Sequence, residues 1–247
     1  MKAAATFVLA AFLALISSVP AQTPTAKSAA PIDLTGYWVS VVTEDWRYRM
    51  VTPVKGDYPS IPLNAEGRKI ADRWDPSKDE ANGNQCKSYG AGNVMRVPEH
   101  LRITWADDNT LRIETDAGQQ TRVFHFGRSQ SSVGEPTWHG DSFSQWEFAG
   151  VGGGGRRGQS ASSGGDLKVV TTHMRPGYLQ KNGVPYSGNA TVTEYFNRAV
   201  EANGDSWLIV TTIVEDPQYL TARFVRSTHF KKLTDNSGWD PTLCIAR

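Results

Sequence analysis

The chain has 247 residues, of which 39% are hydrophobic, and its 26 basic residues nearly balance 25 acidic ones, for a net charge of +1. This length accommodates one large β domain or two small domains. The charge is close to zero and no Lys/Arg run exceeds two residues. The sequence therefore gives no reason to expect a nucleic acid or an anionic membrane surface as a partner.

Residues 1–21 have the organisation of a cleavable signal peptide. Lys2 provides a positive start, residues 3–16 are apolar, and small residues precede an expected cleavage after Ala21. The apolar stretch is shorter than the roughly 20 residues that a bilayer span needs. We expect a periplasmic or secreted protein whose mature form has no membrane span. Residues 22–32 are predicted to be a leader without structure of its own, and 33–247 a single domain.

The first part of this domain combines one strand, one helix and long irregular segments. Residues 37–43 are β-branched and aromatic, which is typical of a strand. Pro and Gly are frequent in the stretch that follows, up to residue 61. Asn64 has the character of a helix N-cap, and Ile70 and Trp74 recur near helical spacing. The pattern predicts a helix over 64–74 that ends at Asp75-Pro76, followed by a loop to residue 94.

The rest of the chain is predicted to be a series of strands. Apolar and polar residues alternate over 101–105 and 111–113, and further strands are predicted over 121–126 and 146–148. Residues 150–165, mostly Gly and Ser, predict a flexible loop. Four longer strands follow over 167–174, 190–198, 207–215 and 221–231. Short connections and a single helix favour an antiparallel barrel or sandwich, because parallel sheets require crossover helices.

Cys86 and Cys244 are the two cysteines of the chain. In an oxidising compartment they predict one disulfide between the C-terminal tail and the first third of the domain. The alternative is a pair of free or metal-bound thiols, although neither cysteine has a second Cys or a His at zinc-finger spacing.

Two short motifs resemble lipocalins and related calycin barrels. Gly36-Tyr37-Trp38 resembles the G-x-W signature at the start of their first strand, and Thr193-Glu194-Tyr195 resembles their T-D-Y motif. Lipocalins are eight-stranded antiparallel barrels around a small apolar ligand. The resemblance implies a mainly β, calycin-like barrel with one short helix, although that family places no helix at 64–74.

A second resemblance covers most of the domain and points to a family of exported bacterial proteins of unassigned function. It is carried by the motifs TWHG (137–140), TTHM (171–174), NGVPYS (182–187), TEYF (193–196) and EDPQYLT (215–221). The family implies export and a shared site but no reaction. Its pattern has a short turn where this chain has the 150–165 loop.

Strand parity suggests where polar chemistry lies inside the barrel. In the strand from residue 167, Thr171 and His173 share a face with apolar neighbours. In the next strand Glu194 lies between Val192 and Phe196 on one face. We therefore expect His173 and Glu194 to point inward, where an unpaired carboxylate is costly and is often functional.

Loop residues supply further candidates at the rim of the barrel. His139 follows Trp138 in an irregular segment and is placed to approach the same interior. Asn182, Tyr186 and Ser187 lie on the long connection between the two strands and are expected to close over its mouth. Trp46 and Trp138, both in irregular segments, are candidate ligand walls.

Three interpretations of His139, His173 and Glu194 stay open. Two His and a carboxylate have the composition of a metal site, or they form an acid/base pair with an orienting group, or they are satisfied polar groups of the barrel wall. His100, His125 and His229 are explained as structural by their strand neighbours. No G-x-S-x-G, dinucleotide-binding or C-x-x-C motif is present, so no cofactor is identified.

The sequence predicts an exported barrel that binds a small, partly apolar molecule through His173, Glu194 and His139. Two alternatives have different consequences. A lyase, isomerase or hydrolase would use Glu194 or His173 as a proton acceptor. An envelope interaction protein without an internal ligand would have a filled barrel.

Overall fold

The structure is a computed structural model that describes residues 23–127, 134–148 and 164–247. The signal peptide predicted over 1–21 and most of the glycine-rich loop predicted over 150–165 lie outside the described residues.

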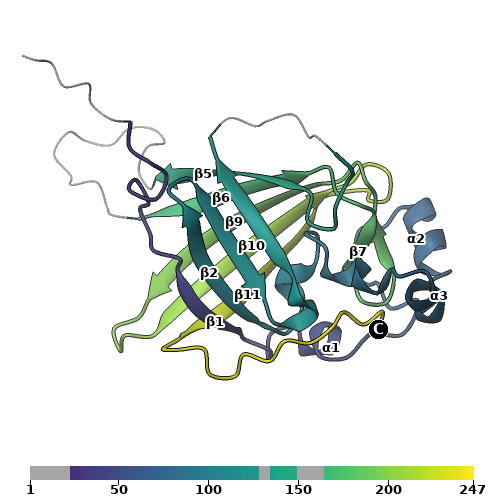
Figure 1. Cartoon of the computed structure of the whole chain (residues 1–247). Helices are drawn as coiled ribbons and strands as arrows, with labels where there is room; N and C mark the ends of the chain where they lie inside the picture. The colour runs from purple at the N-terminus through teal and green to yellow at the C-terminus, as the bar shows by residue number, and fades with distance from the viewer. Residues whose placement is uncertain (1–22, 128–133, 149–163) are drawn as a thin grey trace, which may run out of the picture.

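Nine strands close into one barrel in the order β1-β11-β10-β9-β6-β5-β4-β3-β2 (Figure 1). They are β1 (Gly36–Ser40), β2 (His100–Asp107), β3 (Thr110–Thr115), β4 (Thr121–Phe126), β5 (Asp141–Phe148), β6 (Gly165–Thr172), β9 (Thr191–Val200), β10 (Ser206–Glu215) and β11 (Phe224–Leu233). The mainly β barrel is confirmed. It differs from the eight antiparallel strands of a lipocalin because it has nine strands and because β4 and β5 pair in parallel.

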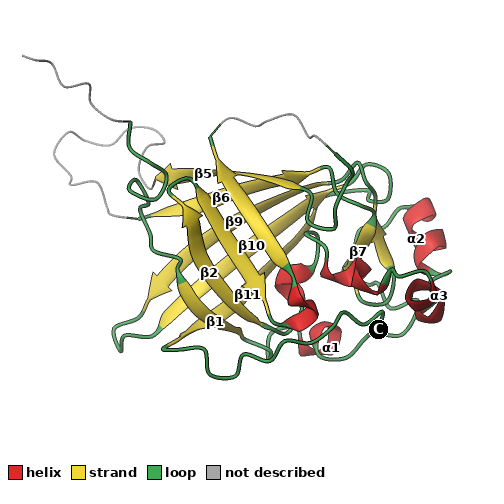
Figure 2. Ribbon diagram, viewed as in Figure 1, coloured by secondary structure: helices red, strands yellow, loops and turns green. Residues whose placement is uncertain are grey.

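The helices gather at one end of the barrel, as Figure 2 shows. They are α1 (Trp46–Arg49), α2 (Ala65–Ala71) and α3 (Pro76–Ala81), with 3₁₀ turns η1 (Gln85–Tyr89), η2 (Val94–Arg96) and η3 (Ala117–Gln119). A short hairpin, β7 (Gly177–Gln180) and β8 (Val184–Tyr186), joins them. We call residues 41–99 and 173–190, which cover this end, the cap. None of the helices in the described ranges is long and apolar enough to cross a bilayer.

The cap contains more helix than the single element expected over 64–74. Asn64 caps α2 as predicted, since its side chain accepts from the Gly67 N–H at 2.9 Å. Asp75-Pro76 does not end the helical region, however. The Asp75 side chain accepts from the Ser77 N–H and Pro76 occupies the first turn, so the same two residues begin α3.

The predicted leader is also structured where it is described. The Lys27 N–H donates to the Asp108 carbonyl at 3.0 Å, and the Ala26 carbonyl accepts from the Trp146 indole at 2.8 Å. Ile32 packs against the barrel core. The expectation that 22–32 lacks structure is therefore wrong for these residues, because contacts to distant strands hold a segment with little intrinsic preference of its own.

Alternate residues of each strand point into the barrel and divide its interior into layers. The half away from the cap is apolar, with fully buried Trp38, Ile103, Phe124 and Phe230. A second apolar cluster lies in and under the cap and includes Tyr58, Leu179 and Tyr186. Four neighbouring strands each contribute one buried polar side chain between the apolar residues of the two clusters: Arg122, Ser142, Thr171 and Glu194.

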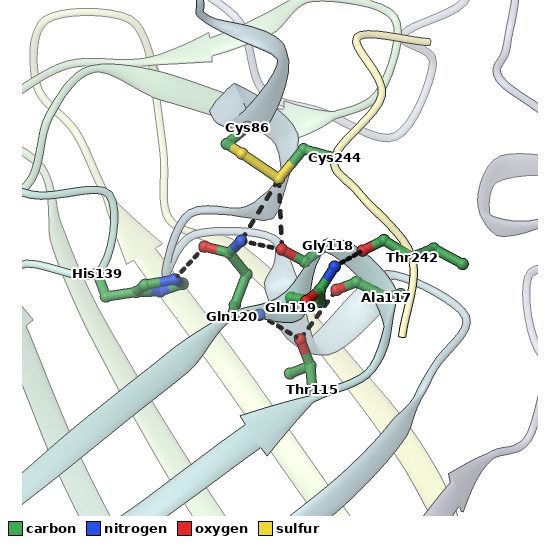
Figure 3. Close-up of a disulfide and its surroundings, with 9 residues drawn as sticks. All are labelled: Cys86, Thr115, Ala117, Gly118, Gln119, Gln120, His139, Thr242 and Cys244. Atoms are coloured by element: carbon green, nitrogen blue, oxygen red, sulfur yellow. Dashed lines mark hydrogen bonds between the residues drawn. A yellow bond between two sulfur atoms is a disulfide. The ribbon is translucent and has the colours of Figure 1, made fainter. Parts of the chain in front are cut away.

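The predicted disulfide is present. Cys86 in η1 and Cys244 in the C-terminal tail are bonded, and 158 residues separate them in sequence. Figure 3 shows that the bond lies next to the turn between β3 and β4. The Gln120 side-chain amide donates to Cys244 Sγ at 3.4 Å, so the disulfide is connected to the barrel rim as well as to the cap.

Candidate functional site

A fully buried ion pair crosses the polar layer of the barrel. Arg122 from β4 donates through Nη1 and Nη2 to the two carboxyl oxygens of Glu194 from β9, at 3.0 and 2.5 Å. Both side chains are 0% exposed. Arg122 also lies 3.5 Å from the Thr171 hydroxyl, which shares a hydrogen bond of 2.8 Å with Ser142. Such a two-pronged contact fixes the guanidinium and occupies both oxygens of Glu194.

Strand parity predicts the inward position of Glu194, and the same rule predicts the inward position of its partner Arg122. Arg122 lies on the same face of its strand as Phe124 and Phe126, so the alternation that placed Glu194 also marks Arg122 as inward. Glu99, two residues before Leu101, is a second inward residue that the same reasoning could have found.

Several buried polar atoms around Arg122 have no hydrogen-bond partner in the described part of the chain. They are Arg122 Nε, His139 Nδ1, Tyr186 Oη and both carboxyl oxygens of Glu99. Glu99 approaches Thr115 and the Tyr186 hydroxyl approaches the Gly92 backbone, but neither contact has the geometry of a full hydrogen bond. The charge of Arg122 shifts the pKa values of His139, Tyr186 and Glu99, so all three lie within reach of its electrostatic field. Because the large majority of buried side-chain polar atoms in proteins are hydrogen-bonded, each of these atoms calls for a partner. We call Arg122, Glu194, Glu99, His139 and Tyr186 the Arg122 site.

His139 is held as a neutral imidazole with a bare acceptor nitrogen. Its Nε2–H donates to Gln120 Oε1 at 2.8 Å (Figure 3), so the other ring nitrogen carries a lone pair. Burial, with a smaller contribution from Arg122, lowers the pKa of His139 to about 3. The residue as a whole is only half-buried, whereas Nδ1 itself has no access to solvent. A hydrogen-bond donor in the interior is therefore the partner that Nδ1 lacks.

Glu99 is a buried acid whose pKa is raised. Its side chain is buried, and burial together with the negative charge of Asp116 raises the pKa of Glu99 well above its ordinary value. Arg49 and Arg122 oppose this shift but donate no hydrogen bond to the carboxyl group. In its protonated form a carboxylic acid can donate one hydrogen bond and accept another, so Glu99 offers a group capable of both.

Tyr186 projects its hydroxyl into the cap interior. The residue is fully buried, and burial raises the pKa of its phenol. The hydroxyl lies against the backbone of Gly90 and Gly177, where a Cβ atom on either glycine would overlap it. Glycine at these positions therefore makes room for a hydroxyl whose approach to the Gly92 backbone falls short of a full hydrogen bond.

Tyr186→Phe and Tyr178→Phe are expected to change stability differently. Tyr186 loses a hydroxyl without a partner, so its variant should range from unchanged to about 1 kcal/mol more stable. Tyr178 donates to the buried carboxylate of Asp79 at 2.6 Å, so its variant should lose about 1.5–3 kcal/mol. Urea unfolding of ligand-free protein measures both. A loss above about 1 kcal/mol in Tyr186→Phe would show that this hydroxyl is bonded.

His173 does not join the site, contrary to the expectation from parity. β6 ends at Thr172, and His173 adopts a left-handed conformation with φ 56°. Alternation no longer applies after that turn. The ring is 27% exposed, and its Nδ1 is paired with Asp141 at 2.9 Å. His173 is therefore part of the outer rim of the barrel.

The other predicted ligand contacts are dispersed. Trp46 is 60% exposed on α1, and Trp138 is half-buried under the Arg175 guanidinium, 4.1 Å from the ring centre. Asn182 is buried and donates to the carbonyls of Val54 and Asp57. Ser187 donates to Asp216 at 2.8 Å. Asn182 thus holds the cap together, and Ser187 ties the cap to the turn after β10. Of the candidates between β6 and β9, only Tyr186 belongs to the Arg122 site.

The described residues include no group of three or more His, Cys, Asp or Glu side chains placed to hold a metal ion. His139, His173 and Glu194 do not form such a group, because His173 is paired with Asp141 at the rim and Glu194 with Arg122 in the interior. No family model matches the chain, and no curated protein or solved structure matches it. Function therefore has to be inferred from the geometry of the site.

Proposed function

We propose that this protein is an exported β-barrel that binds a small polar molecule at the Arg122 site. The observation that carries the proposal is the set of buried, unsatisfied polar atoms on Arg122, His139, Tyr186 and Glu99. Leaving a buried polar group without a partner costs about 1–3 kcal/mol, so a molecule that satisfies several of them gains binding energy. The disulfide and the resemblance to exported bacterial proteins support the export part of the proposal.

The arrangement of donors and acceptors defines the kind of molecule. Arg122 Nε and the Tyr186 hydroxyl offer protons, whereas His139 Nδ1 needs one. The charge of Arg122 is already matched by Glu194, and burial disfavours the charged form of Glu99. A small uncharged ligand with both hydroxyl or amide donors and carbonyl-type acceptors fits these groups, and the apolar layer around Phe124 suits a partly apolar body.

An acid/base enzyme that uses the same site is the second candidate, and Glu99 is the observation that favours it. A buried acid with a raised pKa is suited to proton donation. Glu194 is less suited to the role of proton acceptor, because Arg122 occupies both of its oxygens. In this candidate Glu99→Gln would abolish turnover of a bound molecule, while binding through Arg122, His139 and Tyr186 persists.

Native mass spectrometry of protein purified gently from the cells that make it tests the proposal. We expect the wild type to carry an added organic mass that is lost on denaturation. The polypeptide should begin at Gln22 and be two hydrogens lighter than the sequence because of the disulfide. An N-terminus at Met1 would contradict export.

The matched control removes the polar site and keeps the barrel filled. The double variant Arg122→Met/Glu194→Met replaces both charges by flexible apolar chains of similar length. It should lose the added mass. A bare wild-type protein, or the same added mass on the double variant, would contradict binding at the Arg122 site.

A further inference from the structure

A second polar constellation lies outside the barrel, in a groove between its rim and the C-terminal tail. The groove has a volume of about 370 Å³, within the range of small-molecule sites. We call it the tail groove. Val39, Val42 and Pro98 form an apolar wall, and His100, Asp116 and Asp240 form a polar end. Glu99 of the Arg122 site also lines the groove.

His100 is oriented by Asp116 in the manner of an activated imidazole. Its Nδ1 lies 2.6 Å from Asp116 Oδ2, and its backbone N–H donates to Oδ1 at 2.7 Å. Asp116 accepts two further backbone N–H bonds, from Ala117 at 2.7 Å and Asp240 at 3.2 Å. A carboxylate that accepts from so many donors stays an acceptor, so Nδ1 carries the proton and Nε2 presents its lone pair.

The free nitrogen of His100 lies at the tail groove. Among the described residues Nε2 has no hydrogen-bond partner, and the ring is 25% exposed. Gly238 lies beside it, and a Cβ at that position would come within 3.1 Å of Nε2. The tail passes close to this nitrogen, but the residue beside it, Gly238, has no side chain. The nitrogen therefore remains accessible from the groove.

The charge of the groove indicates what it can accept. Asp116 is matched by His100 and by backbone N–H groups, whereas the exposed Asp240 makes no side-chain bond to another described residue. The polar end thus offers one acceptor nitrogen and one free carboxylate next to an apolar wall.

We propose that the tail groove is a second binding site, for a small molecule with an apolar body and an amine or hydroxyl that donates to His100 Nε2. Amines are preferred over alcohols because Asp240 adds an ionic contact, and carboxylates are rejected by the same charge. The sequence assigns His100 a structural role, and the Arg122 site does not use it. The proposal uses other atoms than the function proposed above, and Glu99 lines both sites.

Titration of the full mature chain, with its disulfide intact, tests this site by NMR of ¹⁵N-labelled histidine. The probes are benzylamine, benzyl alcohol and benzoate, up to about 10 mM, which detects dissociation constants near 1 mM. The pH is about 8, well above the ordinary imidazole pKa of roughly 6.5. We expect the Nε2 resonance of His100 to shift with benzylamine and more weakly with benzyl alcohol, but not with benzoate.

Two variants separate binding from folding. Asp240→Asn keeps the backbone bond to Asp116 and should weaken benzylamine by about two- to fivefold, the effect of an exposed ion pair, while leaving benzyl alcohol unchanged. Gly238→Ala narrows the approach to Nε2 and should weaken both probes; because alanine is strained at φ +81°, the stability of this variant is measured alongside. No shift with benzylamine, an equal shift with benzoate, or unchanged benzylamine affinity in Asp240→Asn would overturn the proposal.

Discussion

Replacing Arg122 by methionine while Glu194 remains is expected to lower the free energy of unfolding by about 3–5 kcal/mol. Glu194 is 0% exposed, and the Arg122 guanidinium donates to both of its carboxyl oxygens. Without Arg122 the carboxylate would be left charged and unpaired in the barrel, which proteins avoid by protonation or unfolding. Glu194→Leu should cost a similar amount, because it leaves the guanidinium unpaired instead.

The double variant Arg122→Met/Glu194→Met distinguishes a charge effect from a packing effect. Replacing both members of a buried ion pair by apolar side chains is often neutral or stabilising. We therefore expect the double variant to recover most of the stability that either single variant loses, as measured by urea unfolding. If the two losses simply add, the pair matters through its shape and contacts with Thr171 and Ser142 rather than through its charge.

Removing the disulfide is the second change with a large expected effect. Cys86→Ser/Cys244→Ser should lower the free energy of unfolding by up to about 4–5 kcal/mol, because a link across 158 residues restricts the unfolded chain strongly. Reduced wild-type protein should match the double variant in urea unfolding. A stable reduced protein would show that tail contacts such as the Thr242 N–H bond to the Asp116 carbonyl, at 3.0 Å, hold the tail without the disulfide.

The same variant has a local consequence for both proposed sites. Gln120 contacts Cys244 and His139 through opposite ends of one amide (Figure 3), so loss of the disulfide should change the ¹⁵N signals of His139. The tail also forms one side of the tail groove. The response of His100 to benzylamine should therefore weaken in the double variant, whereas Tyr186→Phe, which does not contact the tail, leaves it unchanged.

Much of the local structure is determined by the sequence alone. Alternation of apolar and polar residues identifies the strands and turns Glu194 inward, because side chains of a strand point to opposite faces by turns. Asn64 marks the start of α2 through a short-range bond to its own first turn. With only two cysteines, pairing offers a single solution, and Cys86 and Cys244 are indeed bonded.

Only the tertiary structure decides which of the inward polar residues meet. Arg122 and Glu194 are 72 residues apart in sequence, and closure of the barrel, with β4 and β5 in parallel, brings their strands into one polar layer. His173 leaves that layer because a left-handed turn interrupts the strand one residue earlier than parity assumes. Periodicity describes one element at a time, whereas a site depends on long-range register and on where each strand stops.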